Sequence, residues 1–251
     1  MAKNTNSIPE QNVLQGLKNP LNRRSFLQYT GAGVAVSALL LTGCDDDDDA
    51  TGTNMQGAVN LGSGDVGVLN YAYALEQLEA AFYTTVVGMA NFATLFPNAT
   101  ERAVLMDIRN HEVAHREFFR AAITSTAASQ IIPNLTPNLP ASALASRASI
   151  LATARTFEDL GVAAYNGAGK LLTSATFLGI AGKIVSVEAR HAAEIRDMIE
   201  NGTFASGPAG IRSGEIVDAN GLDVALTPAQ VLALAQPFIK ETINASNLPT
   251  T

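Results

Sequence analysis

The chain has 251 residues, of which 47% are hydrophobic and 16% charged, and this balance excludes a disordered or collagen-like protein. A single cysteine excludes an intrachain disulfide and any zinc or iron–sulfur site built from several cysteines. The formal net charge of −7 argues against a nucleic-acid partner. Aromatic residues make up only 6% of this alanine-rich chain, a composition that favours packed helices.

The charges are unevenly distributed about Cys44. Four of the 16 basic residues precede it, but only one of the 23 acidic residues does, which leaves 12 basic and 22 acidic residues in the rest of the chain. A basic head before an acidic body indicates a targeting segment that is separate from the folded domain.

The basic head has the features of a bacterial export signal. Residues 22–27 contain the pair Arg23 and Arg24 and resemble the twin-arginine motif. An uncharged stretch follows, and it is shorter than the roughly 20 residues that a membrane-spanning helix needs. Residues 41–44 (Leu-Thr-Gly-Cys) then resemble a lipobox, which implies cleavage before Cys44 and lipidation of its thiol.

We therefore expect residues 1–43 to be a signal peptide of the twin-arginine route, with Cys44 anchoring the mature protein to a membrane of a bacterial cell envelope. The alternative is a chance arginine pair beside a short buried helix. Residues 44–64 begin with Cys44 and five aspartates and continue with glycine, threonine, serine and asparagine. Such a segment buries little apolar area, so we expect a disordered tether there.

Four segments have the length and apolar spacing of long helices: 66–89, 100–126, 141–172 and 174–200. Residues 201–251 are rich in glycine and proline, and one short helix is expected after Thr227 and Pro228. The predicted fold is therefore all-α, with a four-helix bundle over residues 65–200 and an irregular C-terminal extension over 201–251.

The loop lengths predict how the helices are connected. Short turns join the first helix to the second and the third to the fourth, so each pair should form an antiparallel hairpin. Residues 127–140, with three prolines, connect the hairpins. Fourteen extended residues reach about 48 Å, whereas a helix of 26 residues is about 39 Å long, so this crossover can run the full length of the bundle.

A set of acidic residues and histidines points to a metal centre. The second helix carries Glu112 and His115, and the fourth carries Glu188 and His191, each as Glu-x-x-His on one helical face. The first and third helices each add a glutamate, and together these six side chains match the ligand set of dinuclear carboxylate bundles. The added glutamates are Glu76 and Glu158.

Several readings stay open at these positions. A Glu-x-x-His pair is common on the solvated face of a surface helix, where it binds no metal. Glu79 lies one turn from Glu76 and only about 60° away around the helix, so either can be the ligand of the first helix. His111 is rotated about 100° from its neighbour Glu112, which favours a structural or surface role.

Two tyrosines repeat the spacing of the single glutamates. Tyr83 follows Glu76 by seven residues, and Tyr165 follows Glu158 by seven. These tyrosines are expected near the metals, where their hydroxyls can bond the carboxylates. As plain core aromatics they would need no further role.

Three stretches carry a resemblance to a known family: residues 75–83, 157–165 and 187–191. Through them the chain resembles the ferritin-like superfamily, and within it the bacterial ferritin-like domain family related to desiccation-associated proteins. The resemblance implies a ferritin-like four-helix bundle with a dinuclear centre. It also implies that Glu76 and Glu158 each cap one metal, while Glu112 and Glu188 bridge both.

The chain departs from one pattern of oxygen-activating bundles. Many of these place an aspartate before the second glutamate, as Asp-Glu-x-x-His, to orient the opposite histidine. Here His111 and Val187 stand at those places. Three acidic residues are possible replacements: Asp107, Asp159 and Glu194.

Two divalent cations would balance four carboxylates, and oxygen and imidazole ligands suit iron or manganese, so two Fe or two Mn ions are expected. Three functions are compatible with the sequence. The first is a redox protein acting on peroxide, oxygen or ferrous iron. The second is a non-enzymatic metal-binding lipoprotein for stress or desiccation protection, and the third is a module without metal. A lipid-tethered monomer or small homo-oligomer is expected, because a tethered chain does not readily close into a storage cage.

Overall fold

A computed structural model describes residues 57–205, 216–217 and 221–250. The predicted signal peptide, Cys44 and the acidic run lie outside these residues. Within the described ranges no helix combines the length and apolar character needed to cross a membrane.

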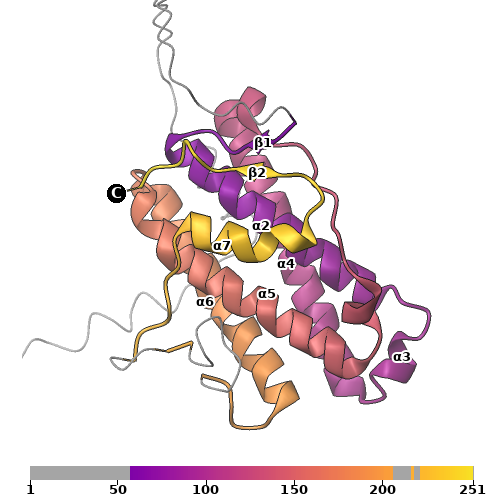
Figure 1. The fold of residues 1–251 in the computed structure, drawn as a ribbon. Helices are drawn as coiled ribbons and strands as arrows, with labels where there is room; N and C mark the ends of the chain where they lie inside the picture. Colours follow the sequence, from indigo (N-terminus) through magenta and orange to yellow (C-terminus); the bar gives the residue numbers. More distant parts are fainter. Residues whose placement is uncertain (1–56, 206–215, 218–220, 251) are drawn as a thin grey trace, which may run out of the picture. The chain divides into compact units, whose positions relative to one another are not determined.

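Four long helices form the bundle, which confirms the predicted fold class (Figure 1). They are α2 (Gly64–Val87), α4 (Ala99–Ala127), α5 (Arg147–Ala168) and α6 (Ala175–Ile199). Polar residues fix where three of them begin: the side chains of Asn98, Ser146 and Ser174 each accept a hydrogen bond from a backbone amide in the first turn.

Two details of the predicted helices differ from the structure. The third helix is predicted from residue 141, but residues Ala141–Leu144 form a 3₁₀ helix (η3) and α5 starts only at Arg147. Ser146 and Ser149 form a reciprocal capping box that sets this start. The first connection contains a further short helix, α3 (Phe92–Leu95), in place of a simple turn.

The crossover is held against α2 by two buried amide side chains. Asn70 donates to the carbonyls of Leu61 and Gln130 at 3.0 and 2.8 Å, and its oxygen accepts from the amide of Ile132. Gln77, seven residues further along the helix, accepts from the amide of Leu135 at 2.8 Å. Because loop backbone groups need such partners when buried, these amides position the crossover along the bundle.

The C-terminal extension forms more structure than the single short helix expected. The predicted helix is present as α7 (Pro228–Ala235), which starts with a capping box formed by Thr227 and Gln230 and packs against α5 (Figure 1). A 3₁₀ turn, η5 (Gln236–Phe238), follows it. The chain crosses α5 closely on its way there, since a Cβ at Gly167 would lie 1.7 Å from the carbonyl oxygen of Leu226.

The expected tether ends earlier than residue 64. Strand β1 (Val59–Asn60) pairs in parallel with β2 (Ile243–Asn244) near the C-terminus, and Leu61 is fully buried. The prediction of disorder is therefore wrong for these residues, because a partner strand distant in sequence supplies their hydrogen bonds and the leucine packs into the core.

Candidate metal centre

The six predicted side chains meet in the interior of the bundle, one or two from each long helix. Glu76 comes from α2, Glu158 from α5, and the two Glu-x-x-His pairs from α4 and α6. All four glutamates are fully buried. Among the described residues, these six side chains form two overlapping groups whose candidate ligand atoms lie within 4.8 Å of one another.

The first group surrounds His115. Its Nδ1 lies 2.8 Å from Glu188 Oε1, 3.5 Å from Glu76 Oε2 and 3.6 Å from Glu112 Oε2. This group therefore contains one histidine and three glutamates whose ligand atoms face a common point. Glu76 belongs to this group alone, whereas Glu112 and Glu188 also belong to the second group.

The second group repeats this arrangement around His191. Its Nδ1 lies 2.7 Å from Glu112 Oε1, 3.5 Å from Glu158 Oε2 and 3.9 Å from Glu188 Oε2. Glu112 and Glu188 thus give one oxygen to each group, so the two groups are joined by both carboxylates.

The atoms that face inward lack hydrogen bonds. Eight of them are buried without a hydrogen-bond partner among the described residues. They are Glu76 Oε2, Glu158 Oε2, both carboxylate oxygens of Glu112 and of Glu188, and Nδ1 of His115 and of His191. Buried polar atoms without partners are costly, and these divide into four per group, which is a donor set that fits a metal ion in each.

Glu79 is a fifth buried glutamate but belongs to neither group. Burial and the surrounding carboxylates, first Glu188, raise its pKa well above the usual range. The absence of a side chain at Gly161 makes room for it, because a Cβ there would lie 3.0 Å from Glu79 Oε1 and 3.5 Å from Glu188 Oε2. Of the two glutamates considered for the first helix, the geometry therefore favours Glu76.

The two tyrosines bond the carboxylates across the bundle. Tyr83 of α2 donates to Glu158 Oε1 of α5 at 2.5 Å, and Tyr165 of α5 donates to Glu76 Oε1 of α2. In each glutamate this leaves Oε2 as the oxygen that faces the histidine. The reciprocal pairing also shows that α2 and α5 run antiparallel at the site.

His111 occupies the place where many oxygen-activating bundles have an aspartate, and it contacts the opposite histidine as that aspartate would. Its Nδ1 lies 2.9 Å from Nε2 of His191, and the two rings are nearly parallel. Since Nδ1 of His191 faces the carboxylates, its Nε2 is the atom left to donate, and His111 accepts. Burial and the positive charge of His191 lower the pKa of His111, which favours this neutral acceptor form.

The acidic residues considered as replacements do not take this role. Asp159 forms a buried pair with Arg196 that joins α5 to α6, with oxygen–nitrogen distances of 2.8 and 2.5 Å. Glu194 is exposed. Asp107 is also exposed and acts on His111 only through its charge. The position of His111 was the available signal, but the sequence analysis looked for an acidic replacement and so did not identify this histidine as the partner of His191.

Burial and mutual contacts shift the pKa values of the clustered side chains in opposite directions. Burial raises the pKa of Glu76 to about 7, and it also raises the pKa of Glu158 and of Glu188. Burial alone would lower the pKa of His191, but its contacts with Glu112 and Glu158 raise it to about 11. Contacts with His115 and His191 hold the pKa of Glu112 at about 2 despite its burial.

Comparison with known families agrees with this geometry. A family model described as a ferritin-like domain matches residues 64–201, which is more than half of the chain and includes every residue of both groups. No curated protein matches the chain.

Replacement of His111 should weaken metal binding. We expect His111→Ala to lower the affinity about 10- to 100-fold, because an outer partner fixes the tautomer and orientation of a ligating histidine. His111→Asp should restore most of the loss, and Asn110→Ala on the neighbouring exposed position should have no effect. Titration against a competing chelator measures this, and equal affinities for wild type and His111→Ala would contradict it.

Removal of metal should make stability depend on pH. The pKa of Glu76 is raised by folding. Its contribution to the free energy of unfolding is therefore fully present below about pH 4.5 and is lost as the pH rises through about 7. The contribution of His191 to the stability of the fold is also lost as the pH rises, from the pKa of the unfolded state up to the folded-state pKa of about 11. From Glu76 alone we expect a loss of about 3 kcal/mol between pH 5 and pH 9.

Chemical denaturation of the metal-free protein at several pH values measures this dependence. Below pH 4.5 the pH dependence of stability reverses. Protonation of Glu112, whose pKa is about 2, then removes stability as the pH falls. Bound metal should flatten the curve above pH 5, since cations take the place of protons among the carboxylates. A gain in stability of the metal-free protein from pH 5 to pH 9 would show that the buried carboxylates do not carry the protons assigned to them.

Proposed function

This chain belongs to the ferritin-like domain family, and on that premise we propose that it is a redox protein with a dinuclear, carboxylate-bridged iron or manganese centre. The proposed ligands are Glu76, Glu112, His115, Glu158, Glu188 and His191. The observation that carries the proposal is the set of eight buried ligand atoms without hydrogen bonds, four for each metal position.

The chemistry of the donors supports this choice of metal. Six carboxylate oxygens and two imidazole nitrogens form a hard to intermediate donor set, which suits iron or manganese better than a soft, thiolate-seeking ion. Two divalent cations balance the four carboxylates. When bound, such a pair of metals supplies a store of two electrons and open coordination positions for a small oxidant.

The surrounding residues hold this donor set in place. Tyr83 and Tyr165 each bind one oxygen of a terminal glutamate, which leaves the other oxygen fixed toward the metal position. His111 fixes the ring of His191 from outside. No histidine in the described chain holds His115 in this way, so the two metal positions have different outer surroundings.

The location is a separate part of the proposal. Arg23, Arg24 and the lipobox ending at Cys44 support export by the twin-arginine route and a lipid anchor in a bacterial envelope. Since that route exports folded proteins, the centre can be filled before export. The substrates that fit an envelope redox centre of this kind are peroxide, oxygen and ferrous iron.

The freshly purified protein should contain close to two iron or manganese ions per chain. His115→Ala and His191→Ala should each lower that content and also the melting temperature, because the free energy of metal binding adds to that of folding. Elemental analysis and thermal unfolding measure both effects. Exposed His111 is not a proposed ligand, so His111→Asp serves as the control and should keep both metals.

Two outcomes would change this assignment. Unchanged metal content in both histidine variants would refute the ligand set. Two bound metals with no consumption of peroxide or oxygen and no oxidation of ferrous iron would leave a metal-binding protein, for which stress or desiccation protection is then the better proposal.

The lipid anchor predicts that Cys44→Ala releases the mature protein from the membrane fraction. Cell fractionation and immunodetection measure this. A variant that stays fully membrane-bound would show that the apolar run before Cys44 is itself the anchor.

A further inference from the structure

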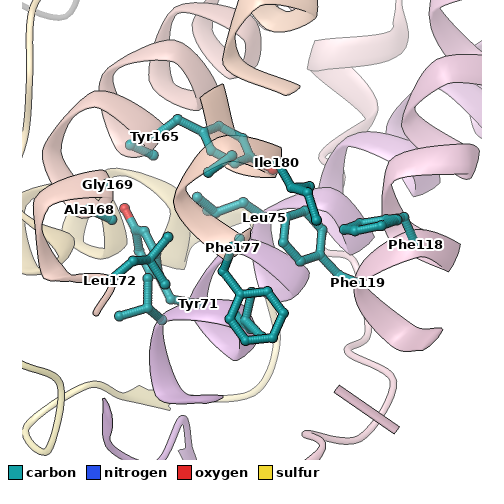
Figure 2. A pocket seen from close by; sticks show the side chains of 15 residues that line it. Tyr71, Leu75, Phe118, Phe119, Tyr165, Ala168, Gly169, Leu172, Phe177 and Ile180 are labelled. Atoms are coloured by element: carbon teal, nitrogen blue, oxygen red, sulfur yellow. The ribbon is translucent and has the colours of Figure 1, made fainter. Parts of the chain in front are cut away.

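A small apolar cavity lies between the four long helices (Figure 2), and it shares Tyr165 with the surroundings of the candidate metal centre. Fifteen residues from α2, α4, α5, α6 and the turn between the last two line it, and only two of them, Tyr71 and Tyr165, carry a polar side-chain atom. Half-buried Phe118, Phe177 and Ile180 also line it.

Tyr165 connects the cavity to the metal centre. Its side chain forms part of the wall, and its hydroxyl donates to Glu76 Oε1. A molecule in the cavity is therefore separated from a proposed metal ligand by a single side chain.

Tyr71 offers an unused hydrogen-bond donor. Its side chain is 1% exposed, and its hydroxyl has no partner among the described residues. Figure 2 shows the Tyr71 oxygen near Ala168 and Gly169, within the lining of the cavity. A buried hydroxyl without a partner is uncommon, so it points to a guest that can accept one hydrogen bond.

The size of the cavity limits the guest. Its volume is about 20 Å³. A cavity needs about 10–15 Å³ to hold one water molecule, so this one takes roughly one or two heavy atoms. Water itself is disfavoured as the guest, because a buried water needs two to four polar partners. Within the described lining, the Tyr71 hydroxyl is the one polar side-chain group without a hydrogen-bond partner.

We propose that this cavity binds molecular oxygen on its way to the metal centre. Oxygen has two heavy atoms, it is apolar, and it can accept a weak hydrogen bond from Tyr71. Peroxide would lose several hydrogen bonds with water on entering these walls, and a ferrous ion would lose its oxygen ligands. The inference rests on the proposed redox function and selects oxygen among its three candidate substrates.

Xenon is the probe for the cavity, since it binds in small apolar cavities and needs no metal. We expect xenon NMR or a crystal under xenon pressure to show one site between Tyr71 and Tyr165, in both the metal-free and the metal-loaded protein. The absence of xenon from this cavity in both forms would overturn the proposal.

Filling the cavity should remove this binding. Ala168→Leu places a larger side chain in the lining, and we expect it to abolish xenon binding at this site. Ala143→Leu is the matched control in η3, a similarly buried alanine outside the cavity, and it should bind xenon as the wild type does. If Ala168→Leu fails to fold, Ala72→Val fills the same cavity by a smaller step.

The reactions of the ferrous-loaded protein separate oxygen from peroxide. We expect Ala168→Leu to slow the reaction with oxygen at least tenfold and to leave the reaction with peroxide within twofold of wild type. An equal slowing of both reactions would overturn the proposal, as would an oxygen rate unchanged in a variant that no longer binds xenon. A protein that takes up xenon in the cavity but binds no metal would instead refute the proposed function.

Discussion

The bundle is organised around the burial of acidic groups in an apolar core. Four carboxylates and two imidazoles lie among packed hydrophobic side chains, where an isolated charge would be very costly. Each carboxylate therefore needs a cation, a proton or a hydrogen-bond donor, and the residues around the site follow from this need. Tyrosines bind the outer oxygens of Glu76 and Glu158, a glycine at 161 leaves space for Glu79, and the histidines lie between the carboxylates.

The site is symmetric in its inner groups and asymmetric in its outer ones. Glu76 with Tyr165 and Glu158 with Tyr83 form equivalent pairs across α2 and α5, as the repeated spacing in the sequence indicated. Beyond these, His191 has a histidine partner at the surface, whereas Val187 occupies the corresponding place in the second Glu-x-x-His segment. The two candidate ligand groups, which contain the same kinds of side chain, therefore have different surroundings, and the difference comes from a single pair of positions in the chain.

Most of the bundle could be predicted because its signals are local. Apolar spacing indicated the four helices, and the residues at Glu-x-x-His and Glu-x6-Tyr spacing do meet in space. What was missed depends on distant partners. Strand β1 is ordered only because residues 243–244 pair with it, the crossover is held by Asn70 and Gln77, and His111 meets His191 from another helix. None of these contacts leaves a periodic pattern in the sequence.

The close crossing at Gly167 bears on what constitutes the folding unit of this protein. The family match ends at residue 201, yet the segment from 221 onward adds buried side chains over α5, among them Leu226 and Val231. It also supplies the strand that pairs with β1. A chain ended at residue 201 would leave that face of α5 open to water, and such an exposed apolar face favours aggregation. The region that identifies the family is thus smaller than the region that must be synthesised before this face of α5 is covered.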